Sequence, residues 1–169
     1  MIHRPELLDA LQSTTAGPLE VTAWRHMFGV RPPDRENTRG ARWNPPGVAA
    51  IYLSLTRDGV IAEGDHAIAV QPFRPRARRV VYAVRLTLNN VLDLTDPSDL
   101  TRTGLTADDL AADDPTACRE IGAAVHWLEQ DGLLVASARG DDRNLVIYPA
   151  NRSPDAVFDF GDGEQIAVP

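Results

Sequence analysis

The feature that most restricts the fold of this chain is the uneven order in which strand-like and helix-like segments follow one another. Clear alternation of apolar and polar side chains makes residues 79–88 the strongest strand prediction. Shorter segments also predict strands, at residues 21–27, 49–55, 91–94, 132–138, 144–150 and 156–160. Helical periodicity is found at residues 5–12, 57–70 and 115–130. Because the two kinds of segment do not alternate regularly, we expect an α+β fold with a curved mixed or antiparallel sheet flanked by helices, and not a doubly wound parallel sheet.

Three residues give the expected helix boundaries. Thr56 suits the N-cap of the helix at 57–70, because its hydroxyl can accept from an unpaired backbone N–H of the first turn. Pro115 suits the first turn of the helix at 115–130, and Gly132 suits the position just after its end. These signals predict that the helix is followed directly by the strand at 132–138.

Length and composition set the domain organisation. The chain has 169 residues, and we expect one domain over 1–169, with its core at about 20–150 and a peripheral N-terminal helix and C-terminal tail. The single cysteine, Cys118, cannot form an internal disulfide, and no Cys/His cluster has metal-ligand spacing. No apolar run approaches the roughly 18 residues of a membrane span, and the first residues lack a signal-peptide core. The expectation is a cytoplasmic, metal-free protein with no membrane segment.

The basic residues are all of one kind. The chain has a formal net charge of −7, and its 17 basic residues are all arginine. A negative net charge argues against direct nucleic-acid binding, which needs a cationic face. The absence of lysine excludes Schiff-base chemistry and a P-loop lysine. A phosphate held by a charged side chain must therefore be held by the planar fork of arginine.

The segment at 39–47 is the most unusual part of the sequence. It belongs to a longer stretch, 29–47, whose four prolines and three glycines predict a loop. It places Arg42, Trp43 and Asn44 beside a Pro-Pro-Gly turn, which preorganises the side chains next to it. Arg42 could bind a phosphate through two nitrogens, and Trp43 could stack on a ligand. The alternative is a structural loop with an exposed arginine and a core tryptophan.

A strand followed by a helix places two further candidates near one cleft. Tyr52 lies in the middle of the strand at 49–55, and Glu63 lies about two turns into the helix at 57–70. Their separation of eleven residues, one on each element, lets both side chains face the same cleft. The alternatives are a core tyrosine and a solvated surface glutamate.

The first strand contributes an arginine. Alternation places Trp24 and His26 on one face of the strand at 21–27 and Arg25 on the other. A buried Arg25 would need a partner, and either Glu63 or a bound phosphate would serve. His26 has no serine or cysteine nucleophile at a recognisable spacing and is interpreted as structural.

The end of the strand at 132–138 supplies the last candidates. Ser137 is followed by Arg139 and Gly140, and no G-x-S-x-G elbow surrounds it. Ser137 is therefore a better hydrogen-bond donor to a ligand than a nucleophile, and Arg139 is a further binding candidate. The alternative for Ser137 is an ordinary turn residue.

In order and spacing these segments resemble the RES domain, the toxin component of RES–Xre toxin–antitoxin pairs. The matching motifs are Trp24-Arg25, Gly40 to Pro46, Ala50 to Leu53, Glu63, residues 91–95, Gly104 to Asp109, and the helix leading into residues 131–140. The resemblance covers about residues 20–150.

The resemblance implies a fold like the diphtheria-toxin type of ADP-ribosyltransferase, with NAD⁺ as substrate and no bound cofactor. Characterised members of the family break the nicotinamide–ribose bond by phosphorolysis or hydrolysis, and the loss of NAD⁺ arrests growth. Inorganic phosphate is the co-substrate in the first case. A mono-ADP-ribosyltransferase that modifies a host protein, and a non-catalytic partner-binding module, are the alternatives.

The resemblance also implies roles for individual residues. Glu63 would stabilise the positive charge that develops on the ribose, and Tyr52 would stack on nicotinamide. Arg42, the third expected catalytic residue, would hold the pyrophosphate together with Arg25. The expected NAD⁺-binding residues are Arg25, Trp43, Asn44, Ser137 and Arg139.

The resemblance implies partners as well. We expect an Xre-family antitoxin, with a helix-turn-helix for DNA and a C-terminal segment that blocks the active site. Any DNA contact would then be made by that partner. A homodimer within a larger toxin–antitoxin complex is the expected assembly.

Overall fold

The computed structural model describes residues 3–72, 78–138 and 141–169. Its helices are α1 (Pro5–Gln12), α2 (Arg57–Ala69), α3 (Pro97–Arg102), α4 (Ala107–Ala111) and α5 (Thr116–Trp127), with a 3₁₀ turn at Pro149–Asn151. Its strands are β1 (Ala16–Phe28), β2 (Ile51–Ser54), β3 (Arg79–Leu94), β4 (Gly132–Ala136), β5 (Arg143–Ile147) and β6 (Val157–Ile166).

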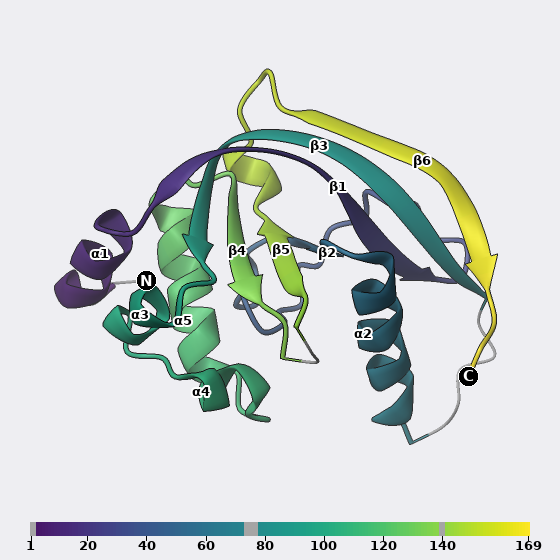
Figure 1. Cartoon of the computed structure of the whole chain (residues 1–169), viewed down its shortest axis with the longest axis horizontal. Coiled ribbons are helices and arrows are strands. Elements are labelled where there is room, and N and C mark those ends of the chain that lie inside the picture. The colour runs from purple at the N-terminus through teal and green to yellow at the C-terminus, as the bar shows by residue number, and fades with distance from the viewer. Residues whose placement is uncertain (1–2, 73–77, 139–140) are drawn as a thin grey trace.

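The strands form one mixed sheet in the order β1-β2-β5-β4-β3-β6, and β1 also pairs with β3. The extra pairing closes the sheet on itself, so that the long β1 and β3 arch over β4, β5 and β2 (Figure 1). Strands β3 and β4 run parallel, and the other pairs are antiparallel. The expected α+β fold with a curved mixed sheet is confirmed.

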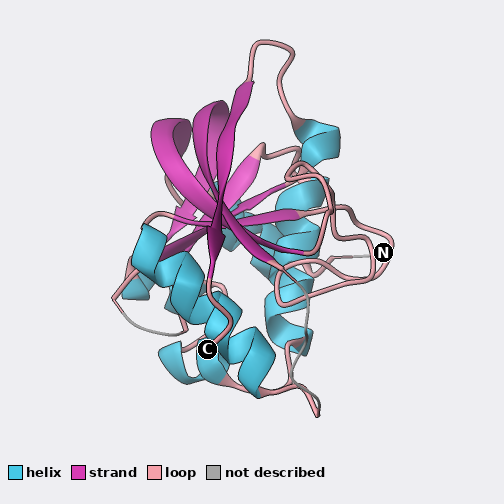
Figure 2. Cartoon of the chain, turned by 90° about the vertical axis from the view of Figure 1, so that its right-hand side faces the viewer, coloured by secondary structure: helices cyan, strands magenta, loops and turns pink. Residues whose placement is uncertain are grey.

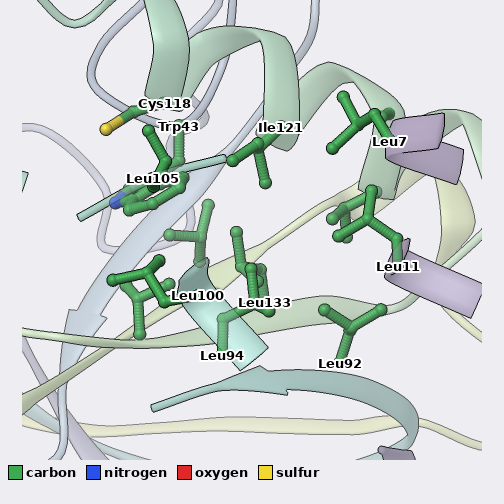
Figure 3. Packing of buried hydrophobic residues seen from close by; sticks show 14 of the residues in the cluster. Leu7, Leu11, Trp43, Leu92, Leu94, Leu100, Leu105, Cys118, Ile121 and Leu133 are labelled. Atoms are coloured by element: carbon green, nitrogen blue, oxygen red, sulfur yellow. The ribbon is translucent and has the colours of Figure 1, made fainter. Parts of the chain in front are cut away.

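Two hydrophobic cores result from this closure. The inner core lies inside the curved sheet, where β1 to β5 all contribute side chains such as Ala23, Leu53, Leu86 and Leu145. The outer core fills the space between β4 and β5 and the helices, with Trp43, Leu100, Leu105, Cys118 and Ile121 at its centre (Figure 3). Strand β4 is buried on both faces, because one face meets each core.

The helices lie on one side of the sheet, and the long strands rise on the other (Figure 2). Helix α2 stands apart from α1, α3, α4 and α5, at the other end of the sheet (Figure 1). It begins as expected, because the Thr56 Oγ1 accepts from the Gly59 backbone N–H at 3.0 Å.

The expected strands at 79–88 and 91–94 are one continuous strand, which corrects the prediction of two. The polar pair Asn89-Asn90 has the composition of a break, but it stays extended within β3. The buried carboxylate of Asp131 accepts from both backbone N–H groups, at 2.7 Å and 3.1 Å. A side chain distant in the sequence thus replaces ladder partners that no local pattern supplies.

The expected end of the helix at 115–130 is also corrected. Helix α5 ends at Trp127, and Glu129 takes the left-handed conformation with φ of 57°. Gly132 is instead the first residue of β4, paired with Val91 and Ile147. A Cβ at Gly132 would lie 2.9 Å from the Val146 carbonyl oxygen, so glycine here allows a close approach of β5.

The N-terminal helix is packed into the structure, whereas the C-terminal strand lies at the edge of the sheet and has no fully buried residue. Leu7 and Leu11 of α1 are buried in the outer core. The C-terminal strand β6 extends to Ile166 and pairs along β3 from Arg79 to Thr87. Helix α1 is therefore part of the core, whereas β6 borders the sheet.

Candidate active site

The loop between β2 and α2 places Tyr52 and Glu63 in one site. Tyr52 is in the middle of β2, where it pairs with Val146 of β5. Glu63 lies on the second turn of α2, after the Thr56 cap. A Cβ at the next residue, Gly64, would lie 2.9 Å from the His26 ring, so the glycine lets α2 approach β1 closely. The two residues, eleven positions apart, therefore face the same cleft, as expected from the sequence.

Two adjacent cavities share Tyr52, Glu63 and Asn144 in their walls. The first has a volume of about 280 Å³ and lies between α2, β1 and β2, with His26, Phe28, Ser54, Val60 and Gly64 among its lining residues. The second has a volume of about 200 Å³ and lies against the 39–47 loop, with Ala41, Arg42, Trp43, Leu110 and Ala136 among its lining residues. A ligand that fills both would pass the Glu63 carboxylate.

The Glu63 carboxylate is held by two neighbours. Its Oε1 accepts from the Ser137 hydroxyl at 3.1 Å and from the Asn144 side-chain amide at 3.2 Å. Asn144 is fixed in turn, because its Oδ1 accepts from the Ser54 hydroxyl at 3.0 Å. Side chains from β2, from β5 and from the segment that follows β4 thus orient a carboxylate carried by α2, as a site that stabilises a developing positive charge requires.

The Tyr52 hydroxyl is engaged by the 39–47 loop. It donates to the Asn44 Oδ1 at 2.7 Å and accepts from the Trp43 backbone N–H at 3.0 Å. Burial raises the pKa of Tyr52 well above its usual value, so the side chain remains a neutral phenol. Tyr52 therefore offers its ring to the cavities and does not serve as a base.

Asn44 fixes this loop and does not line either cavity. It is fully buried, and its Nδ2 donates to the carbonyl oxygens of Asn37 at 3.0 Å and Val48 at 2.7 Å. Gly40, at φ of 91°, packs against the Pro46 ring, where a Cβ would lie 3.0 Å from Cδ. In this structure Asn44 positions the Tyr52 hydroxyl, which donates to its Oδ1.

Arg42 and Trp43 flank the second cavity. The Arg42 guanidinium donates to the Ala112 carbonyl at 2.9 Å, which holds it at the cavity wall. Trp43 is 3% exposed and packs in the outer core, while its carbonyl accepts from the Tyr148 hydroxyl at 3.0 Å. The loop therefore has both a core tryptophan and an arginine in the site.

Arg25 does not join this site. It lies on the opposite face of β1 from His26, as the alternation predicted, and it is not paired with Glu63. Its guanidinium donates to the Arg35 carbonyl and to the Met27 Sδ. Of the two partners considered for a buried Arg25, Glu63 is therefore excluded, because Arg25 lies on the face of β1 away from the cavities that Glu63 lines. Arg139 lies outside the described residues.

Three polar residues that line the first cavity, His26, Ser54 and Asn144, are not among the site residues predicted from the sequence. Asn144 and Ser54 lie in segments that were interpreted only as strands, and His26 was interpreted as structural. Strand pairing brings them together, since Ser54 is opposite Asn144 between β2 and β5. For His26 alone the sequence gave partial information, because alternation placed it on the same face of the strand as Trp24.

The surroundings of His26 make it a neutral imidazole. Its Nε2 accepts from the Arg79 Nε at 3.0 Å, and Arg79 forms an ion pair with Asp65 at 2.6 Å. Burial, and next the Arg79 charge, lower the pKa of His26 to about 4, while Asp65 opposes the shift. His26 is therefore uncharged at neutral pH.

The free energy of unfolding should consequently fall as the pH drops from about 6.5 to 4. In this range His26 is protonated in the unfolded chain but stays neutral in the folded protein, so protonation favours the unfolded state. His26→Gln retains an acceptor for Arg79 but does not titrate. We expect this variant to lose less stability than the wild type between pH 7 and pH 4.5, measured by urea unfolding. Equal losses in both proteins would contradict the assignment.

Other features of the surface do not add to this site. A larger hollow of about 450 Å³ lies on β1, β3 and β6, away from Glu63, and its Arg85 is paired with Asp159. Among residues 3–72, 78–138 and 141–169, no group of three or more His, Cys, Asp or Glu side chains could hold a metal ion. In the same part of the chain, no helix is long and apolar enough to span a membrane.

The mixed sheet and the paired cavities define an α+β protein with a candidate ligand site built around one oriented carboxylate. The family model of the RES domain matches residues 16–166, and the chain belongs to the RES domain family. The resemblance seen in the motifs is thus confirmed.

Relatives of known activity are found among mycobacteria. The NAD(+) phosphorylases MbcT of Mycobacterium tuberculosis and Mycobacterium bovis are each 32% identical to this chain over 122 residues, or 68% of this chain and 64% of the relative. The match thus spans slightly less than two thirds of their length. A chain in the crystal structure of the M. tuberculosis MbcT–MbcA toxin–antitoxin complex matches with a TM-score of 0.86 and 25% identity, covering 96% of this chain and 93% of that one.

Proposed function

We propose that this protein is a toxin that breaks the nicotinamide–ribose bond of NAD⁺ with inorganic phosphate as the acceptor. The observation that carries the proposal is the Glu63 carboxylate, oriented by Ser137 and Asn144 where two cavities meet. The similarity to NAD(+) phosphorylases of the same family supports phosphate over water as the acceptor.

The reaction moves positive charge from the nicotinamide ring to the ribose, which suits this site. The bond between ribose C1″ and the nicotinamide nitrogen breaks, and its electron pair leaves with nicotinamide, which becomes neutral. A phosphate oxygen then bonds to C1″, giving ADP-ribose-1″-phosphate. As the bond breaks, the ribose acquires positive charge like that of a glycosidase transition state, and a fixed carboxylate stabilises it.

The two cavities divide the substrate between them. The first, with the Tyr52 ring in its wall, suits the flat nicotinamide. The second, with Arg42, suits the negatively charged pyrophosphate side of the molecule. The Ser137 hydroxyl, already on Glu63, is placed to orient the ribose. Trp43 supports the wall of the second cavity, and Arg139 remains a binding candidate.

The proposal includes a partner and a location. We propose a neutralising antitoxin of the Xre type, whose C-terminal segment enters the site, and a homodimer of the toxin within the complex. The substrate is intracellular, so the protein acts in the cytoplasm. Direct nucleic-acid binding is not part of the proposal, given the net charge of −7.

Arg42→Gln should raise the KM for NAD⁺ about 10- to 100-fold, because a charge-assisted hydrogen bond to phosphate is worth about 1.5–3 kcal/mol. The measurement is initial-rate kinetics of NAD⁺ loss. Arg85→Gln, at an exposed arginine on the outer face of the sheet, is the matched control and should leave KM unchanged. A normal KM in the Arg42→Gln variant would remove this residue from the site.

Expression in cells tests the toxin proposal as a whole. Induction should lower intracellular NAD⁺ before growth stops, and Glu63→Gln should abolish both effects. Isotope-labelled NAD⁺ supplied to the lysate distinguishes the alternative, because a protein ADP-ribosyltransferase would leave label on protein. Growth arrest with normal NAD⁺ and no labelled protein would contradict both activities.

A further inference from the structure

Arg79, the first residue of β3, is a buried arginine whose guanidinium joins three other parts of the chain. Its side chain is 2% exposed. Its Nε donates to the His26 Nε2 of β1 at 3.0 Å, its Nη2 donates to the Asp65 carboxylate of α2 at 2.6 Å, and its Nη1 donates to the Ala167 carbonyl after β6 at 2.7 Å. Because all three nitrogens are bonded in a buried place, the guanidinium has one fixed orientation.

The contact with Arg79 determines which nitrogen of His26 carries a hydrogen. Arginine has donors only, so the Nε2 atom that it contacts must be an acceptor with a free lone pair. The hydrogen of the neutral ring is then on Nδ1. A second proton on Nε2 would break the hydrogen bond and would face the guanidinium charge at close range. The geometry therefore holds His26 as one neutral tautomer.

The other charges around His26 act in the opposite direction. Helix α2 packs against the ring and carries two carboxylates, Asp65 and, in the wall of the same cavity, Glu63. Burial, and next the Arg79 charge, lower the pKa of His26 to about 4, whereas Asp65 favours the imidazolium. From β2, Tyr52 adds only a neutral phenol to the cavity wall. Arg79 is thus the charged group that opposes protonation of His26.

The charge of the first cavity matters because the proposed substrate brings a positive charge into it. The nicotinamide ring of NAD⁺ is a cation until its bond to ribose breaks, and the first cavity is where we place this ring. With His26 neutral, Glu63 is the one charged residue among the described residues that line this cavity. An imidazolium in the same wall would repel the ring and offset the attraction of the carboxylate.

We propose that Arg79 is a positioning residue that keeps His26 neutral in the wall of the first cavity, so that this cavity accepts a cationic aromatic ring. Arg79 does not itself line the cavity, so it acts through His26 and not by contact with the substrate. This role rests on the proposed function and adds a residue to it.

Nitrogen-15 NMR of the histidine rings tests the arrangement without any substrate. The chain has four histidines, and His26→Gln assigns the signal. We expect wild-type His26 to be the neutral Nδ1–H tautomer and to remain neutral down to about pH 5. Arg79→Met keeps a long apolar chain and should raise the pH at which the ring titrates by about two units, because the charge is removed and Asp65 loses its partner.

Arg57→Gln is the matched control, because it removes another ion pair between α2 and the sheet, the exposed pair with Glu164. It should leave the titration of His26 unchanged. An Nε2–H tautomer in the wild type, or protonation of its ring near pH 6.5, would overturn the proposal. The wild-type spectrum needs no variant, so this test holds even if Arg79→Met does not fold.

Initial-rate kinetics of NAD⁺ loss test the consequence for the substrate. Each variant is compared with the wild type at the same pH, because phosphate itself titrates in the range used. Relative to the wild type, Arg79→Met should show a KM for NAD⁺ that rises about tenfold between pH 7.5 and pH 5, with a much smaller change in kcat. The double variant Arg79→Met/His26→Gln loses the same contacts but has no ring to protonate, so its relative KM should not depend on pH.

The double variant separates this role from a purely structural one, because damage to the fold would persist in it. A relative KM of Arg79→Met that does not change with pH, or a pH dependence that remains in the double variant, would overturn the proposal. Absence of NAD⁺ loss in the wild type would instead refute the proposed function, and this role with it. The wild-type rate therefore tells the two failures apart.

Discussion

Glu63→Gln should reduce the rate of NAD⁺ consumption about 10³-fold while leaving the fold intact. Glutamine has nearly the same shape and can still accept from Ser137 and Asn144, but it lacks the negative charge that stabilises the ribose cation. Loss of one such preorganised electrostatic group typically costs 10²–10³ in kcat. The measurement is kcat at saturating NAD⁺ and phosphate.

Glu20→Gln is the matched control for this experiment. Glu20 is exposed on β1 and lies at the hollow on the outer face of the sheet, far from both cavities. It should leave kcat unchanged, and both variants should unfold at temperatures close to that of the wild type. A Glu63→Gln enzyme within tenfold of the wild-type kcat would mean that this carboxylate does not carry the chemistry.

Gly122→Ala should strongly destabilise the protein, because α5 packs against the 39–47 loop at this glycine with no room for a side chain. A Cβ there would lie 1.9 Å from the Trp43 carbonyl oxygen and 2.9 Å from the Tyr148 hydroxyl. The helix or the loop must move, which strains the core and weakens the Tyr148–Trp43 hydrogen bond. We expect a loss of about 3 kcal/mol, which lowers Tm by roughly 6–12 °C in a chain of this size.

Gly17→Ala is the control for this substitution. A Cβ at Gly17, near the start of β1, would meet no atom within 4 Å, and the backbone is not left-handed there. Thermal unfolding should show a change of less than about 1 kcal/mol. A Gly122→Ala protein as stable as Gly17→Ala would show that the contact between α5 and the loop is not tight.

Part of this site could be predicted from local sequence. The Tyr52 and Glu63 pair follows from a strand, a capped turn and a helix that are adjacent in the chain, so their spacing determines their geometry. The loop character of 29–47 follows from its prolines and glycines. In each case, local chemistry decides the conformation.

The rest of the site depends on contacts between distant segments. Asn144 reaches Glu63 because β5 pairs with β2 and places Asn144 opposite Ser54. A single asparagine in a strand does not predict which residue it will lie opposite. Alternation in β1 separates Arg25 from Trp24 and His26, but it does not indicate that the Arg35 carbonyl, and not Glu63, is the partner of Arg25. Asn44, two residues after Arg42, turns inward because the loop folds back on Asn37 and Val48.

The continuous β3 and the buried α1 also depend on contacts between distant segments. The Asn89-Asn90 pair continues β3 only because Asp131, some forty residues later, accepts from its backbone. The burial of α1 depends on a core that α5 and β4 build. No local sequence pattern predicts the continuity of β3 or the burial of α1.

The most direct test of the proposed function is the fate of NAD⁺ with the purified, antitoxin-free protein, followed by proton and phosphorus NMR with and without inorganic phosphate. We expect NAD⁺ to be consumed only when phosphate is present, with free nicotinamide and ADP-ribose-1″-phosphate appearing together in equal amounts. Release of free ADP-ribose without phosphate would contradict phosphorolysis and indicate a glycohydrolase. NAD⁺ left intact under both conditions would contradict NAD⁺ cleavage itself.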